Sequence, residues 1–204
     1  ILPIPEPYTS IDYHIVIDNS NVFIGSQKIH NKETGLIQIN PAIRVNVKNL
    51  ARVLEANKLQ IYIKTRMVGG SKPPKNARVW DEWESCGYTC ILGDRSAQDK
   101  EQFVDNMLHA QIYDLLLSYK DSTNRQQVLI LVTGDGNRNR GQTSFPNAVE
   151  RVLANAWNVE LWSCEQSLSP NFLDIQKFFP NRMTIKHLDS YRKDITFEEK
   201  VKQN

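Results

Sequence analysis

The feature that most constrains the fold is an alternation of short apolar runs with helical patterns along most of the chain. Such alternation is typical of a parallel sheet flanked by helices. The clearest run is Gln127–Thr133, in which Val128 to Val132 are apolar throughout, as in a strand buried on both faces of a sheet. We therefore predict an α/β protein, a three-layer α/β/α sandwich with a mainly parallel central sheet.

The other helices and strands are predicted from apolar residues that recur with the spacing of a helix or of a strand. Strands or extended segments are predicted at Tyr13–Asp18, Leu59–Val68, Tyr88–Leu92, Val159–Ser163 and, at a sheet edge, Met183–Leu188. Helices are predicted at Pro41–Asn57, Arg78–Cys86, Asp99–Tyr119, Phe145–Trp157 and Asn171–Phe179. Asn19–Asn40 and Gly69–Asn76 fit neither period, so we expect loops there, the second with positive charge.

Composition bounds the class of protein. The 204 residues suit one domain, 1–204, and no stretch of roughly eighteen apolar residues could cross a bilayer, which predicts a soluble protein without a membrane partner. Three cysteines without paired spacing favour an intracellular compartment, cytoplasmic or nuclear. The start at Ile1 suggests a domain excised from a longer chain, and a homodimer or further domains are both compatible with the sequence.

Two acids follow strands that we expect to be neighbours. Asp18 ends the first strand and Asp135 lies just beyond the strongest one. Ligands of parallel α/β sheets bind beyond the carboxyl ends of the strands, so these carboxylates should converge. Asp105 would join them, because it borders the apolar stripe of its helix. Clustered carboxylates need a compensating cation, which predicts Mg²⁺ or Mn²⁺ at Asp18, Asp105 and Asp135 and favours phosphodiester hydrolysis.

Three blocks around these acids resemble the NYN family of PIN-like ribonucleases: Ile17–Val22, Lys100–Asp105 and Leu131–Asn137. Thr143–Val149 and Trp157–Ser163 are similar to the helix and strand that close such domains, so the similarity spans most of the chain. The resemblance implies a PIN-like fold and a metal-dependent ribonuclease, endonucleolytic on single-stranded RNA.

The resemblance also implies roles for individual residues. Asp18, Asp105 and Asp135 would be the catalytic, metal-binding acids, Asn21 would steady the site or the substrate, and Thr133 would support the strand end. Many members carry a further acid where this chain has Asn137. The sequence leaves three possibilities open: three acids are enough for activity, Glu101 or another acid assists them, or the activity is weak or absent.

Basic residues near the acids and in the Gly69–Asn76 loop could hold phosphates without reading sequence. The residues predicted to bind RNA are Asn21, Lys72, Lys75, Arg78, Asn137, Arg138 and Arg140. Trp80 or Trp83 could stack on unpaired bases, although packing is the commoner role of tryptophan. For His109, one turn after Asp105, a surface or packing role is the preferred interpretation.

Two alternative functions remain open on the sequence. Asn137 in place of an acid is compatible with a catalytically deficient RNA-binding or protein-interaction module on the same fold. A metal-dependent phosphatase would also use such acids, but the first strand ends without an Asp-x-Asp pair, since Ser20 stands two residues after Asp18.

Overall fold

The computed structural model describes residues 10–31, 33–71, 78–93, 100–121, 124–137 and 143–199. The strands are β1 (Ile11–Asp18), β2 (Lys28–His30), β3 (Ile37–Ile39), β4 (Ile43–Val45), β5 (Ile63–Ser71), β6 (Thr89–Gly93), β7 (Gln126–Val132), β8 (Asn158–Ser163), β9 (Met183–His187) and β10 (Thr196–Glu198). The helices are α1 (Asn19–Gln27), α2 (Val47–Glu55), α3 (Val79–Ser85), α4 (Lys100–Ser118), α5 (Phe145–Ala154), α6 (Pro170–Phe178) and α7 (Arg192–Ile195), with 3₁₀ turns η1 (Gln60–Tyr62), η2 (Glu165–Ser167) and η3 (Leu188–Tyr191).

The main sheet has the strand order β6-β5-β1-β7-β8-β9, and every neighbouring pair in it is parallel. From β1 the chain builds outward through β5 and β6 on one side, and then from β7 through β8 and β9 on the other. The order therefore reverses between β1 and β7, where Ile17 lies opposite Val132. In doubly wound sheets this reversal opens a crevice beyond the carboxyl ends of the strands.

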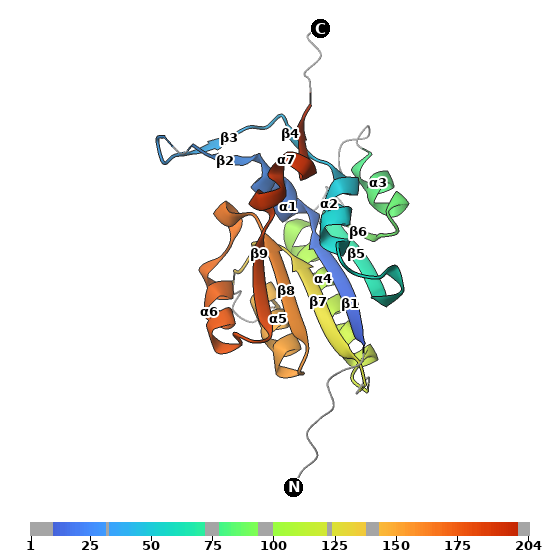
Figure 1. Ribbon diagram of the computed structural model, residues 1–204. Coiled ribbons are helices and arrows are strands. Elements are labelled where there is room, and N and C mark those ends of the chain that lie inside the picture. The colour runs from blue at the N-terminus through green and yellow to red at the C-terminus, as the bar shows by residue number, and fades with distance from the viewer. Residues whose placement is uncertain are drawn as a thin grey trace.

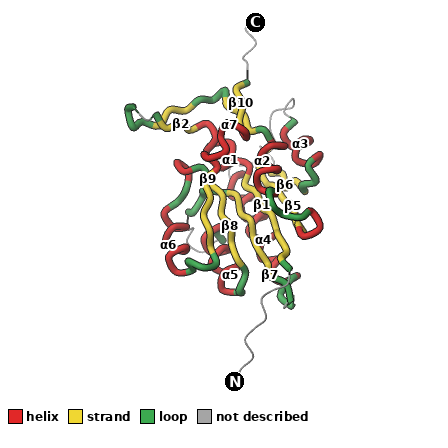
Figure 2. The backbone as a smooth tube through the Cα atoms, viewed as in Figure 1, coloured by secondary structure: helices red, strands yellow, loops and turns green. Residues whose placement is uncertain are grey.

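Two apolar cores cover the two faces of the sheet, so the three-layer α/β/α sandwich is confirmed. On one face, side chains of α2 and α3, such as Leu50 and Trp83, pack on β1 and β7. On the other, α4, α5 and α6 contribute Leu108, Val149 and Phe172. Figure 1 shows α4 and α5 behind the sheet, and Figure 2 shows the strands of the sheet running side by side in front of them. β7 is buried along almost its whole length, as its apolar run predicted.

Several helices begin where a short polar side chain accepts a hydrogen bond from a backbone N–H of the first turn. Asp18 caps α1, Asn46 caps α2, Ser144 caps α5 and Ser169 caps α6. Oxygen-bearing caps of this kind satisfy donors that a helix start leaves without an intrahelical partner. In α1 the cap is also the acid that ends β1, so the strand passes directly into the helix.

The prediction of a loop over Asn19–Asn40 was wrong. This segment forms α1 and a hairpin of β2 and β3 that projects from the body of the molecule (Figure 1). α1 has no regular apolar stripe, since it buries Val22 together with Gly25 and Ser26. The helical period was therefore absent from a segment whose helix depends on its cap and its packing.

Two further boundaries differ from the prediction. The helix expected from Pro41 begins only at Val47, because Ile43–Val45 pairs with β10 from the end of the described chain. The predicted loop from Gly69 is partly strand, since β5 runs to Ser71, and the remaining residues 72–76 lie outside the described residues. A Cβ at Gly69 would press on Leu108, which explains a glycine inside this strand.

Within the described ranges, none of the helices combines the length and the apolar character needed to cross a membrane.

Candidate functional site

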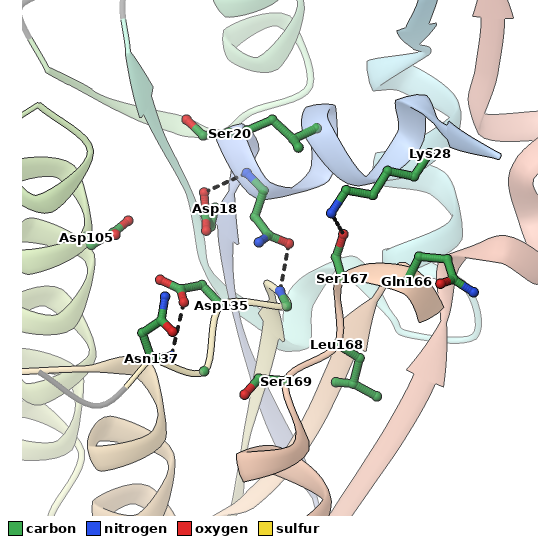
Figure 3. Close-up of a pocket in the computed structure, with 14 residues that line it drawn as sticks. Asp18, Ser20, Lys28, Asp105, Asp135, Asn137, Gln166, Ser167, Leu168 and Ser169 are labelled. Atoms are coloured by element: carbon green, nitrogen blue, oxygen red, sulfur yellow. Dashed lines mark hydrogen bonds between the residues drawn. The ribbon is translucent and has the colours of Figure 1, made fainter. Parts of the chain in front are cut away.

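The carboxyl ends of β1 and β7 open into a pocket of about 440 Å³ (Figure 3). It lies where the strand order reverses, the position at which doubly wound sheets bind their ligands. Its size falls in the range of small-molecule sites. The described residues that line it are Asp18, Ser20, Asn21, Ile24, Lys28, Asp105, Gly134, Asp135, Gly136, Asn137, Gln166, Ser167, Leu168 and Ser169. The pocket thus gathers the three acids predicted from the sequence, together with Asn21 and Asn137.

Two neutral donors help to hold Asp18 in place. Its Oδ1 accepts the backbone N–H of Asn21 at 3.0 Å, and its Oδ2 accepts the hydroxyl of Thr133 at 2.9 Å. The residue is only 5% exposed. Because the two bonds go to different oxygens, they fix the orientation of the carboxylate at the pocket.

Thr133 links the two acids at the strand ends. While its hydroxyl donates to Asp18, the same oxygen accepts the backbone N–H of Asp135 at 3.1 Å. Asp135 then turns the chain, since its Oδ1 accepts the backbone N–H of Asn137 at 3.0 Å. Asn21 closes the connection with its side-chain oxygen, which accepts the N–H of Gly134 at 2.7 Å. The predicted supporting role of Thr133 therefore has a direct geometric basis.

The loop after β7 packs closely against the segment that leads into α6. Ser169 donates its backbone N–H to the carbonyl of Gly134 at 3.0 Å, and the Asn171 amide donates to the carbonyl of Gly136 at 2.7 Å. A Cβ at Gly134 would overlap the Ser167 carbonyl, and one at Gly136 would overlap the Ser169 side chain. Glycine is required at both positions by this close approach, which brings the η2 segment to the pocket.

Asp105 reaches the pocket from α4. It is half-buried and borders the stripe formed by Val104, Leu108 and Ile112, all of which are buried. This position is the one predicted from the helical period. Asp105 also lines a second cavity of about 230 Å³, which shares Asp135 and Asn137 with the first.

His109 lies in the wall of that second cavity and is 3% exposed. Its Nδ1 lies 3.0 Å from the Thr143 hydroxyl, which itself donates to Asn106 Oδ1 at 3.2 Å. The other ring nitrogen, Nε2, makes no hydrogen bond to a described residue. The ring packs edge-on against Phe145 at 4.3 Å, and burial lowers the pKa of His109 to about 4. The packing role predicted for His109 agrees with this position, and the imidazole is neutral at pH 7.

The predicted RNA-binding residues divide into three groups. Asn21 and Asn137 line the pocket, whereas Arg78 lies exposed at the start of α3 and is not among the pocket residues. Lys72, Lys75, Arg138 and Arg140 lie outside the described residues. The suggestion that tryptophans stack on bases was wrong: Trp83 is fully buried, Trp80 is 8% exposed, and both belong to the core under α3.

Sequence reasoning missed the pocket wall opposite the acids. Lys28, Gln166 and Ser167 lie there, and the Lys28 ammonium donates to Ser167 Oγ at 3.4 Å. The sequence carried no local signal for this pair, because Lys28 stood in a predicted loop and Ser167 in a connection far along the chain. Only the packing of η2 against α1 and the Gly134 loop brings the pair to the site.

Asp18, Asp105 and Asp135 form what we call the acidic wall of the pocket. Its carboxylate oxygens are of the kind that hard divalent cations bind. Among the residues that the structure describes, no group of three or more His, Cys, Asp or Glu side chains is close enough to hold an ion directly. Mg²⁺ usually keeps several waters and binds through one or two carboxylates, so the donors fit an ion that is held partly through water.

No protein-family model and no curated protein sequence matches the chain. A solved structure of a protein of unknown function from Vibrio parahaemolyticus is similar to it, with a TM-score of 0.59 and 15% sequence identity. The similarity covers 94% of this chain and 99% of that chain. At this identity the similarity bears on the fold alone, and it extends the α/β architecture described above to a second protein over nearly its whole length.

Proposed function

We propose that the protein is a divalent-metal-dependent ribonuclease that hydrolyses phosphodiester bonds within single-stranded RNA. The observation that carries the proposal is the pocket at the sheet reversal, into which three separate elements bring Asp18, Asp105 and Asp135. The resemblance of the surrounding sequence blocks to the NYN family supports the same chemistry. Mg²⁺ or Mn²⁺ bound among the three acids, partly through water, would offset their charge, polarise the phosphate and lower the pKa of a bound water.

The chain's own residues position the reactants. Asp18 is held from two sides by the backbone N–H of Asn21 and the hydroxyl of Thr133, which keeps its carboxylate in one orientation. Asp135 Oδ1 accepts the backbone N–H of Asn137. Asp135 Oδ2 makes no hydrogen bond to a described residue. That oxygen is suited to accept a proton from the attacking water, whose oxygen forms a bond to phosphorus as the bond to the leaving ribose oxygen breaks. The leaving oxygen takes up a proton from a water molecule of the solvent.

The test is cleavage of a fluorescent single-stranded RNA by the purified protein with Mn²⁺ or Mg²⁺. We expect cleavage to be abolished by chelator and reduced about a hundredfold or more in Asp135→Asn, a loss comparable to removing a principal electrostatic group from other enzymes. Asn keeps an oxygen that can accept from Asn137, so the turn should persist in this variant. Asp105→Asn should behave alike, whereas Asp114→Asn, an exposed acid on the same helix, is the matched control.

Intact RNA under every metal condition would overturn the nuclease proposal. If the protein then still bound RNA in chelator, with an affinity that falls as salt rises, it would be a binding module on this fold. The observation that favours this second function is Asn137, a neutral side chain at the edge of the pocket next to Asp135.

A further inference from the structure

The pocket has two chemically different walls. In Figure 3 the three acids lie toward one side, and Lys28 with Ser167 lies toward the other. Lys28 is the basic residue among the described residues that line the pocket. A polyanion that approaches the acids is repelled by them, so a cation across the pocket would determine where its phosphates settle.

The backbone of Lys28 is held in place, although its side chain is only half-buried. Lys28 ends α1 by donating its N–H to the Gly25 carbonyl, and its own carbonyl accepts from the Arg192 guanidinium at 2.9 Å. The same guanidinium contacts the Ser26 carbonyl. These bonds place the lysine at the pocket rim and leave its ammonium directed to Ser167.

The Lys28–Ser167 pair has donors to spare. One ammonium N–H goes to Ser167 Oγ at 3.4 Å, and among the described residues Lys28 forms no ion pair. Two ammonium protons and the Ser167 hydroxyl proton therefore remain for an acceptor in the pocket. A cation beside a hydroxyl, each with a proton to donate, matches a phosphate oxyanion, to which charge-assisted hydrogen bonds are strong.

We propose that Lys28 and Ser167 form a phosphate-binding subsite that holds one phosphate group of the substrate across the pocket from the acids. This inference rests on the proposed function, since it names the part of the substrate that the opposite wall receives. The phosphate is either an internal phosphodiester of the strand or a terminal phosphate monoester. Lys28 and Ser167 act by binding and positioning, and neither provides a proton in the bond-breaking step.

The experiment measures binding in chelator, where no cleavage occurs. A short labelled single-stranded RNA is titrated with wild-type protein, Lys28→Gln and Lys48→Gln over a series of salt concentrations. Lys48 is an exposed lysine of α2 away from the pocket and serves as the matched control. For Lys28→Gln we expect weaker binding, with a slope of log affinity against log salt smaller by about 0.7, the loss of one single-strand phosphate contact. Lys48→Gln should keep the wild-type slope.

Two more variants separate charge from hydrogen bonding and from misfolding. Lys28→Arg should retain the salt slope, because it keeps the charge. Ser167→Ala should weaken binding with little change of slope, since it removes only a neutral donor. Thermal melting of each variant checks that the fold persists.

Two RNA arms identify the phosphate. If Lys28→Gln changes the slope equally for RNA with a 5′-phosphate and with a 5′-hydroxyl, the subsite holds an internal phosphodiester. A change confined to the 5′-phosphorylated RNA assigns a terminal monoester. Equal slopes for Lys28→Gln and wild type on both RNAs, or no RNA binding by the wild type, would overturn the subsite. A Lys28 effect on binding by a protein that never cleaves RNA would preserve the subsite and overturn only the nuclease proposal.

Discussion

The two ends of β1 each carry a buried aspartate, and the two differ in what holds them. Asp12, 3% exposed, accepts from the Arg125 guanidinium at 2.7 and 2.5 Å, with Lys64 at 3.8 Å. Asp18, 5% exposed, lines the pocket and accepts hydrogen bonds from two neutral donors, the backbone N–H of Asn21 and the hydroxyl of Thr133. At the amino end a guanidinium binds the carboxylate in a fixed pair; at the carboxyl end neutral donors orient it next to a space that a ligand can enter.

The pKa of Asp12 reflects its pairing. Burial by itself would raise it, but hydrogen bonds from Arg125 and Gln127 and the nearby charges of Arg125 and Lys64 hold the pKa of Asp12 below its ordinary value. The negatively charged form of Asp12 therefore stabilises the folded protein. The comparison shows two settings within one strand: Asp12 lies in an ion pair, and Asp18 lines the pocket to which we assign the proposed activity.

The largest expected effect is on activity at the carboxyl end. Asp18→Asn should lower RNA cleavage about a hundredfold or more, because it removes one negative charge from the acidic wall. The free energy of unfolding should fall by about 1 kcal/mol, since Asn can still cap α1 but no longer offers a second oxygen to the Thr133 hydroxyl. Single-turnover cleavage and urea unfolding measure the two quantities. A variant that cuts at the wild-type rate would remove Asp18 from the site.

The opposite pattern is expected at the amino end. Asp12→Asn should lower the free energy of unfolding more than Asp18→Asn does, because it removes the buried carboxylate that Arg125 binds, although hydration of the partly exposed Arg125 offsets part of the loss. Cleavage should stay within about twofold of wild type, as for changes distant from a site. When Arg125 is first replaced by Met, Asp12→Asn should lower the free energy of unfolding clearly less than it does in the wild type. An equal loss in both backgrounds would show that the Asp12–Arg125 ion pair does not stabilise the fold.

The pH dependence of stability should separate the histidines from the paired acids. Burial lowers the pKa of His109 to about 4, so the unfolded chain binds protons more readily than the folded one. The associated stability is complete above about pH 6.5 and is lost as the pH falls toward 4, by about 2 kcal/mol between pH 7 and pH 5. His14, whose pKa burial also lowers, adds in the same direction.

The measurement is urea unfolding of wild type and His109→Gln across that pH range. The variant should lose stability less steeply with falling pH, whatever its absolute stability at pH 7. Asp12 has a lowered pKa, so its contribution is present above the unfolded pKa of about 3.9 and is lost only below it. Parallel pH curves for variant and wild type would show that His109 does not titrate in this window.

The smallest expected effect concerns the edge of the pocket. Asn137→Asp adds an acid beside Asp135, where charged oxygen ligands strengthen the binding of hard cations. The concentration of Mn²⁺ for half-maximal cleavage should fall several-fold. Asn155→Asp, an exposed position at the end of α5, controls for the added charge. An unchanged metal requirement would indicate that residue 137 takes no part in holding the ion.

Much of the framework could be predicted from local sequence, because its signals are short-range. The apolar run of β7 and the stripe of α4 each determine burial within a few residues, and both elements formed close to the predicted limits. The acids attached to them, Asp135 and Asp105, both line the pocket, and their positions in these elements follow from the same local patterns. Asp18 followed because β1 and β7 are neighbours, as buried parallel strands at the reversal of a doubly wound sheet must be.

Other features depended on contacts between distant segments. α1 has no apolar stripe, and it forms where Asp18 caps it and where Cys164 and Ser167 pack against Gly25. β4 exists because β10 pairs with it from the end of the described chain. No window of local sequence contains both partners of such contacts, so periodicity could not reveal them.

The sequence by itself thus determined the alternation of strands and helices, the burial of the central strand and the acids at the strand ends, because each of these follows from neighbouring residues. Only the tertiary structure decided that Thr133 joins Asp18 to the backbone of Asp135, and that Lys28 faces them beside Ser167. Those pairs are separated by many residues in the chain, and their side chains meet only when the packing of sheet, helix and loop fixes their positions.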